Sequence, residues 1–360
     1  MRITIFAAAL LLVSMAVARP VGTPAAAAAA CVTATPVCTE FVTLGGGPGR
    51  SMIYRTYPLD TRNDAIRRAL IMVHGTNRNA DHYFETSIAA AFLAGALEDT
   101  VVIAPHMIDQ TEKPAENEIV WESSWRTGGP ARTNPALSSF DFVDELLRKL
   151  ANKSTFPNMK ALVVAGHSAG GQFANRYEMS NKVHDTLGVP ITYVVANPSS
   201  YAWPDALRPL ADGDADPATA KEGWNQRDTT PLPAHTSYTF GPFDASKAPN
   251  FNRWPSGFEN RTGYNASVSD AQLKKQLVER PTTYLLGQVD TLPLGGFDSS
   301  PNAMAQGPTR RSRGEAYFKY ITETLGAKQA IMIVPECGHN DRCMYTTNIV
   351  FPVIFPKLGN

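Results

Sequence analysis

The five residues at 166–170, Gly-His-Ser-Ala-Gly, fit the pattern G-x-S-x-G. They close an apolar, β-branched run at 161–167 and lead into a stretch with helical spacing at 169–181. In that context the glycines allow a sharp turn between a strand and a helix whose backbones pass close together. The turn exposes Ser168 at the start of the helix, within reach of a carbonyl carbon. We therefore expect Ser168 to be a catalytic nucleophile.

A serine hydroxyl is a weak nucleophile, so it needs a base and a group that orients the base. When the serine occupies such a turn, the acid and then the histidine follow after later strands of the sheet. His339 directly follows the last predicted strand, and Asp290 directly follows the strand before it. We predict His339 as the base and Asp290 as its orienting acid. Asp298 and Asp270 remain alternatives for the acid.

Acyl transfer also needs backbone donors for the oxyanion that develops during attack. Ala169 follows the nucleophile, and its amide is the first predicted donor. The second donor is expected from the loop that begins with His74 and Gly75. The Thr76 amide is our prediction for this donor, and the Asn77 amide is the alternative. His74 itself is expected to turn the end of the strand through hydrogen bonds.

Short apolar runs alternate with longer stretches of helical spacing along most of the chain. The apolar runs cover 69–74, 100–106, 161–167, 191–196, 282–287 and 329–335. The helical stretches cover 80–97, 138–151, 169–181 and 309–325. Continuous apolar runs of this length are typical of buried parallel strands. The alternation predicts an α/β fold in which helices cover both faces of a mostly parallel sheet, with an antiparallel hairpin at 41–57.

The segment 199–280 interrupts this alternation. It is rich in Pro, Gly, Asn and aromatic residues and shows little periodicity before a short helical stretch at 269–279. Ordered loops of this length are usually functional. We expect a cap or lid, inserted between the sixth and seventh strands and lying over the carboxyl edge of the sheet.

Aromatic residues near the expected cleft are candidates for contacts with the substrate. Trp121 and Trp125 precede the serine motif, and Tyr201 and Trp254 belong to the predicted cap. We predict that these rings line an extended apolar groove for a polymer or an aryl ester. The alternative is that they pack the cap onto the sheet, as aromatic rings often do.

The amino terminus has the composition of an export signal, with a basic residue, an apolar run and then small residues. Cleavage is expected after Ala18 or after Ala30. Residues 1–30 are then the signal peptide, and 31–360 are the catalytic domain. The apolar run is too short for a comfortable membrane anchor, so we expect a secreted or periplasmic protein without a membrane span.

Four cysteines form two close pairs, Cys31 with Cys38 and Cys337 with Cys343. Exported proteins keep cysteines as disulfides, and two local bridges are the simplest of the three possible pairings. The second bridge would clamp the loop that carries His339. A zinc site is the alternative for this loop, but the loop offers at most two sulfurs and one imidazole. We therefore expect no metal.

Charge and composition exclude several other classes. Lys plus Arg and Asp plus Glu both number 33, so no basic excess exists for binding nucleic acid or an anionic membrane. Hydrophobic residues make up 43% of the chain and charged residues 18%, which is typical of a folded globular domain.

Five motifs, at 74–84, 166–177, 197–203, 285–290 and 338–340, together resemble secreted serine hydrolases of the α/β-hydrolase superfamily, specifically extracellular esterase-like enzymes. The resemblance covers about 40–355. It implies the α/β-hydrolase fold and a Ser-His-Asp triad that cleaves carboxylic esters through an acyl-enzyme, with no cofactor. The wider superfamily includes polyester depolymerases, feruloyl esterases and hydrolases of oxidised polyvinyl alcohol.

The resemblance does not identify the acyl group of the substrate. A hydrolase of β-diketone C–C bonds, a peptidase or an acyltransferase would use the same triad. A binding module without catalysis would have lost a member of the triad, whereas all three positions are occupied here. A small-molecule or polymeric ester is therefore the expected substrate.

Overall fold

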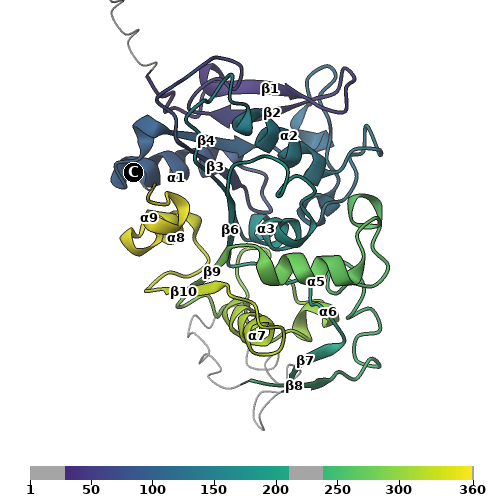
Figure 1. Cartoon of the computed structure of the whole chain (residues 1–360). Coiled ribbons are helices and arrows are strands. Elements are labelled where there is room, and N and C mark those ends of the chain that lie inside the picture. Colours follow the sequence, from purple (N-terminus) through teal and green to yellow (C-terminus); the bar gives the residue numbers. More distant parts are fainter. Residues whose placement is uncertain (1–28, 211–237, 359–360) are drawn as a thin grey trace, which may run out of the picture.

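The computed structural model describes residues 29–210 and 238–358. The predicted signal peptide, apart from its last two residues, and the part of the predicted cap at 211–237 lie outside the described residues. Eight strands form the main sheet, in the spatial order β1-β2-β4-β3-β5-β6-β9-β10 (Figure 1). Their bounds are β1 Thr39–Thr43, β2 Arg50–Arg55, β3 Arg68–Val73, β4 Thr100–Pro105, β5 Ala161–His167, β6 Ile191–Ala196, β9 Thr282–Gly287 and β10 Ala330–Val334.

The pairing of these strands confirms the predicted sheet. β1 pairs antiparallel with β2, and β2 pairs antiparallel with β4. The pairs from β4 through β3, β5, β6 and β9 to β10 are all parallel. The carboxyl ends of β3, β5, β9 and β10 therefore meet at one edge, which brings together the loops that follow them.

Helices cover both faces of the sheet, as predicted. Their bounds are α1 Ala80–Leu93, α2 Ser139–Ala151, α3 Ala169–Ser180, α5 Asp270–Glu279, α6 Pro301–Met304, α7 Arg310–Glu323, α8 Asp341–Thr346 and α9 Phe351–Ile354. Side chains of β3 alternate between two core clusters: Leu70 and Met72 pack with α1, α8 and α9, whereas Ile71 and Val73 pack with α2 and α3. A third cluster joins α3, α5 and α7 (Figure 1).

One helix is shorter than its sequence pattern predicts. The apolar spacing continues to residue 97, but α1 ends at Leu93. Gly95 adopts a positive φ of 63°, which ends the helical path at little cost for a residue without a side chain. Leu97 then begins a separate short 3-10 turn that leads into β4.

The described part of the predicted cap consists of a two-stranded sheet, β7 Leu207–Leu210 with β8 Thr239–Pro242, followed by loops and α5. Tyr201 and Trp203 from this insertion pack with Tyr317 of α7. α5 packs directly against α3. The described residues of the insertion therefore extend the core beside α3 and α7 (Figure 1).

Both predicted disulfide pairs are bonded, Cys31 with Cys38 and Cys337 with Cys343. In the second pair both sulfurs are used in the bond, so they are not available as zinc ligands. None of the helices in residues 29–210 and 238–358 combines the length and the hydrophobicity that a membrane span requires.

Candidate active site

Ser168 stands at the turn between β5 and α3, with φ 59° and ψ −117°. This backbone conformation is rare for a residue with a side chain and persists only where surrounding structure enforces it. A Cβ on Gly166 would lie 2.1 Å from the Gly170 oxygen, and a Cβ on Gly170 would lie 2.1 Å from the Val73 oxygen. Both positions therefore require glycine, which explains why the motif has it there.

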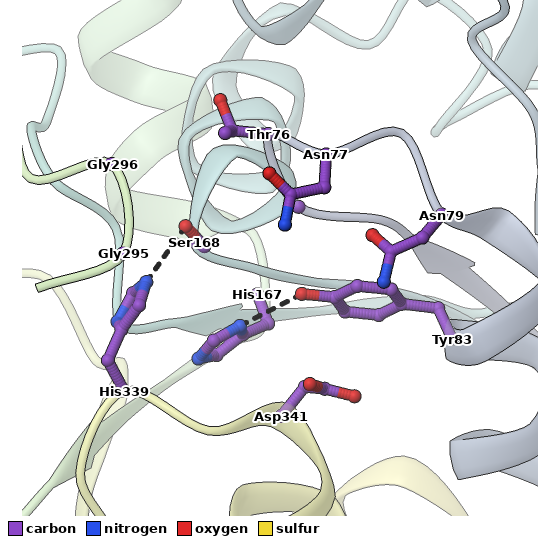
Figure 2. Close-up of a pocket in the computed structure, with 11 residues that line it drawn as sticks. Thr76, Asn77, Asn79, Tyr83, His167, Ser168, Gly295, Gly296, His339 and Asp341 are labelled. Carbon is purple, nitrogen blue, oxygen red and sulfur yellow. Dashed lines mark hydrogen bonds between the residues drawn. The ribbon is translucent and has the colours of Figure 1, made fainter.

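His339 bridges Ser168 and Asp290. Its Nε2 lies 2.9 Å from Ser168 Oγ, and its Nδ1 lies 2.9 Å from Asp290 Oδ2 (Figure 2 shows the contact with Ser168). An ionised carboxylate only accepts hydrogen bonds, so Nδ1 carries the proton and Nε2 presents its lone pair to the serine hydroxyl. This geometry suits proton transfer from Ser168 during nucleophilic attack. The structure thus brings together the three side chains selected from the sequence.

The two alternatives for the acid have other partners. Asp270 begins α5, and its Oδ1 accepts a hydrogen bond from Arg261 at 2.6 Å. Asp298 Oδ1 accepts from the backbone amide of Ser300 at 3.0 Å. Among the three aspartates, Asp290 is the one that is hydrogen-bonded to His339.

Asp290 is 2% exposed, and a buried carboxylate is unfavourable without a compensating charge. Arg310, which is fully buried, supplies that charge: one of its terminal nitrogens lies 3.6 Å from Asp290 Oδ1. Its Nε donates to Ser199 Oγ at 2.8 Å, and its other terminal nitrogen donates to the Gly295 carbonyl at 2.9 Å. Arg310 could not be predicted from the sequence, because no spacing rule links a helix residue to this aspartate.

The predicted oxyanion donors both lie beside the nucleophile. Ala169 is the first residue of α3, so its amide has no carbonyl partner inside the helix. Thr76 lines the same cavity as Ser168, and a Cβ on the preceding Gly75 would come within 3.7 Å of Ser168 Cβ. Their role as oxyanion donors remains a prediction.

His74 turns the end of β3 through two hydrogen bonds. Its Nε2 accepts from the Met107 amide at 3.0 Å, so Nδ1 must carry the proton that is donated to the Gly75 carbonyl at 2.8 Å. Burial lowers the pKa of His74 to about 3 and keeps the ring neutral. A neutral histidine therefore anchors the loop that carries Thr76.

A cavity of about 220 Å³ opens at Ser168 (Figure 2). Most side chains that line it are polar, and the lining set is Gly75, Thr76, Asn77, Asn79, Tyr83, His167, Ser168, Gly295, Gly296, His339 and Asp341. Gly295 adopts a φ of 55°, and a Cβ there would lie 3.1 Å from His339 Cδ2. The loop after β9 therefore packs closely on the imidazole.

The predicted aromatic groove is wrong for three of its four residues. Trp121, Trp125 and Tyr201 are 1%, 2% and 0% exposed, so they lie in the core and cannot contact a substrate. Trp125 stacks edge-on against His74 at 4.7 Å. Trp254 is half-buried and donates from its indole nitrogen to the Thr127 carbonyl at 3.2 Å, outside the cavity lining. These large apolar rings are buried because removing them from water stabilises the fold.

The disulfide between Cys337 and Cys343 closes the loop that presents both His339 and Asp341 to the cavity. The Gly338 carbonyl within this loop accepts from the Asn197 side-chain amide at 3.3 Å. Covalent closure and this hydrogen bond restrict the loop that carries the proposed base.

The sequence of residues 70–347 matches the alpha/beta hydrolase family, and the chain belongs to this family. No curated protein matches the chain.

Two solved structures are similar over most of their length. Poly(aspartic acid) hydrolase-1 from Sphingomonas sp. KT-1 is 20% identical with a TM-score of 0.55, and the alignment covers 88% of this chain and 98% of that one. A poly(3-hydroxybutyrate) depolymerase from Bordetella parapertussis is 21% identical with a TM-score of 0.55, and the alignment covers 86% and 85%. At this identity the similarity shows the shared fold alone.

Proposed function

We propose that the protein is an exported serine hydrolase that cleaves carboxylic ester bonds. The observation that supports this most strongly is that His339 is hydrogen-bonded to both Ser168 and Asp290. Ser168 and His339 also line a cavity. Membership of the alpha/beta hydrolase family agrees with hydrolysis. The similar fold of a poly(3-hydroxybutyrate) depolymerase makes a polyester one candidate substrate.

The first half of the proposed reaction forms an acyl-enzyme. His339 Nε2 takes the proton from Ser168 as Oγ attacks the ester carbonyl, and Asp290 stabilises the imidazolium that results. The amides of Thr76 and Ala169 donate to the tetrahedral oxyanion. When this intermediate collapses, the ester C–O bond breaks and His339 returns the proton to the leaving alcohol.

The second half releases the acid. Water takes the place of the alcohol, and His339 removes its proton as it attacks the acyl carbon bound to Ser168 Oγ. The C–O bond to the serine then breaks, and the proton on His339 returns to Ser168. Every proton is carried by the one imidazole, so the proposed cycle uses only groups of this chain and water.

Export is part of the proposal because both cysteine pairs are oxidised. Disulfides of this kind persist in oxidising compartments such as the periplasm or the extracellular medium. We propose that a signal peptide within residues 1–30 is removed by cleavage after Ala18 or after Ala30, and that 31–360 form the catalytic domain, with 199–280 inserted into it.

Replacement of the nucleophile tests this function. Ser168→Ala should abolish hydrolysis of p-nitrophenyl butyrate and labelling by a fluorophosphonate probe. Ser246→Ala is the matched control, because Ser246 is an exposed serine that is hydrogen-bonded to Asp244. It should leave both signals unchanged. Undiminished hydrolysis by the Ser168→Ala protein would contradict the proposal.

A hydrolase of β-diketone C–C bonds would use the same three side chains. A substrate panel on the purified protein separates the two reactions, because it compares short esters, long-chain esters, insoluble polyesters and a β-diketone. A higher kcat/KM for the β-diketone than for every ester would replace the ester assignment, and the serine mechanism would remain.

A further inference from the structure

One wall of the cavity is built from hydrogen-bonding groups that the proposed triad does not use. Tyr83 and Asn79 stand on the side away from Gly295 and Gly296, and Asp341 lies below them (Figure 2). They come from α1, from the loop before it and from α8. We call these three residues the polar wall.

His167 determines how the Tyr83 hydroxyl is oriented. The Gly287 amide donates to Asn197 Oδ1 at 2.8 Å, so the Asn197 Nδ2 group is the one that faces His167 Nε2 at 3.4 Å. An amide NH₂ only donates, and His167 Nε2 must therefore be the acceptor. The ring proton then lies on Nδ1, which is 3.0 Å from the Tyr83 oxygen (Figure 2).

The Tyr83 oxygen consequently accepts a hydrogen bond from His167 and keeps its own proton for another partner. Burial and the nearby Asp341 carboxylate raise the pKa of Tyr83, so the hydroxyl stays protonated. Tyr83 is only 4% exposed, and it lines the cavity. Its O–H group is thus a buried donor beside Ser168, and it has no protein acceptor among the described residues.

Asp341 gives the polar wall an acceptor and a negative charge. Its Oδ2 accepts from Thr86 Oγ1 at 2.9 Å, and its Oδ1 lies 3.1 Å from His82 Nε2. No Lys or Arg is among the described residues that line the cavity. A carboxylate on the substrate would therefore meet repulsion here without a compensating cation.

We propose that the polar wall is a subsite for a short, neutral acyl group that carries a hydroxyl. The hydroxyl would accept from Tyr83 and donate to Asp341, and Asn79 adds an amide on the same side. A cavity of about 220 Å³ lies below the range usual for drug-sized ligands, which favours short acyl chains. This inference rests on the proposed ester hydrolysis and names its substrate class: esters of small hydroxy acids.

Three p-nitrophenyl esters test the subsite. The 3-hydroxybutyrate and 3-methylbutyrate esters differ only by a hydroxyl in place of a methyl group, and the hemisuccinate carries a carboxylate. The wild-type protein should show a kcat/KM for the hydroxy ester about tenfold or more above that for the methyl ester, with the hemisuccinate lowest. Equal or greater activity on the methyl ester, or fast hydrolysis of the hemisuccinate, would overturn the proposal.

Variants assign the preference to individual residues. Tyr83→Phe should reduce the ratio of kcat/KM for the hydroxy ester over the methyl ester to near one, because only the hydroxyl is lost. A purely structural effect would lower both values and leave the ratio unchanged, which would contradict the assignment. Tyr57→Phe is the matched control, since Tyr57 is also buried but donates to the Leu97 carbonyl at 3.4 Å. It should keep the wild-type ratio.

The charge of the wall needs a separate variant. Asp341→Asn should raise kcat/KM for the hemisuccinate relative to the methyl ester about fivefold, because it removes the repulsion but keeps the shape. An unchanged ratio would remove Asp341 from the subsite. If the esters are hydrolysed through Ser168 without any preference for the hydroxyl, the subsite fails and the proposed function stands. If Ser168→Ala hydrolyses them as fast as the wild type, the proposed function fails.

Discussion

The proposed base and the proposed acid lie on two neighbouring loops that are stabilised by different kinds of interaction. The base loop, 337–343, follows β10 and is closed by a disulfide. The acid loop, 290–309, follows β9 and has no cysteine. It is instead held by two buried arginines of α7, Arg310 and Arg313. One loop is fixed covalently, and the other is fixed by charge and hydrogen bonds.

The arginines bind the acid loop at several backbone positions. Arg310 compensates Asp290 and donates to the Gly295 carbonyl. Arg313 donates to the Gly307 carbonyl at 2.8 Å and to the Asp298 carbonyl at 2.9 Å. Burial lowers the pKa of Arg313 to about 9, which still leaves it charged at neutral pH.

The difference between the loops has a physical consequence. A disulfide acts mainly by restricting the unfolded chain, so its loss should lower the free energy of unfolding moderately. A buried charge without its partner destabilises the native state directly, so loss of an arginine should damage the acid loop more. The free energy of unfolding should therefore fall more when Arg310 is replaced than when the base-loop disulfide is removed.

The largest effect is expected from Arg310→Met, which leaves the Asp290 carboxylate buried without its cation. We expect the free energy of unfolding to fall by about 3–5 kcal/mol and kcat to fall with it. Urea unfolding and ester hydrolysis at 25 °C measure both. Arg310→Lys should restore part of each, because it keeps the charge.

Lys319→Met is the control for this variant. Lys319 also lies on α7, and its Nζ pairs with Glu323 at 3.0 Å, with 35% and 62% of the two side chains exposed. Solvent-accessible pairs of this kind contribute about 0–1 kcal/mol. If the Arg310 and Lys319 variants lose the same stability and activity, the acid loop does not depend on the buried charge.

The intermediate effect is expected from removal of a disulfide. Cys337→Ser with Cys343→Ser should lower the free energy of unfolding by about 2 kcal/mol and should also lower kcat/KM, because His339 lies inside the opened loop. The other disulfide is a matched control with a similar sequence separation, 7 residues against 6. Cys31→Ser with Cys38→Ser should lower the free energy of unfolding by a similar amount and leave kcat/KM unchanged. Equal activity of the two double variants would refute a positioning role for the base-loop disulfide.

The smallest effect concerns the loop after β3, in which the neutral His74 anchors the predicted oxyanion donor Thr76. An unfolded histidine binds a proton below about pH 6.5, whereas native His74 does so only below about pH 3. Between these values the unfolded state binds the extra proton, so stability falls as the pH falls. Because of this histidine, the free energy of unfolding should fall by about 1 kcal/mol between pH 6 and pH 5.

His74→Asn checks this contribution, because asparagine does not titrate. Urea unfolding midpoints at pH 6 and pH 5 should show a smaller decrease in the variant than in the wild type. The same pH dependence in both proteins would mean that His74 does not carry the effect.

The features that could be predicted from the sequence are those set by local patterns. Continuous apolar runs predicted the parallel strands, and the glycines around Ser168 predicted the turn between strand and helix. Chain order then selected Asp290 and His339, and the structure brings both into hydrogen-bonded contact. Each of these inferences needs only neighbouring residues or the order of elements.

The features that could not be predicted depend on how distant elements pack. Arg310 and Tyr83 lie on helices α7 and α1, and their contact with the site depends on how these helices pack against the sheet. The prediction of an aromatic groove was wrong for a related reason. Composition shows that large rings are present, but it does not show that Trp121 and Tyr201 face the core.

In the proposed mechanism Ser168 is a nucleophile that His339 activates. Peptide mapping after reaction with a fluorophosphonate, combined with the labelling rate of His339→Ala, measures this activation. We predict a single adduct on the peptide that contains Ser168, and a labelling rate at least about 1,000-fold lower in the variant. An adduct on a different residue, or an unchanged labelling rate in His339→Ala, would rule out this mechanism.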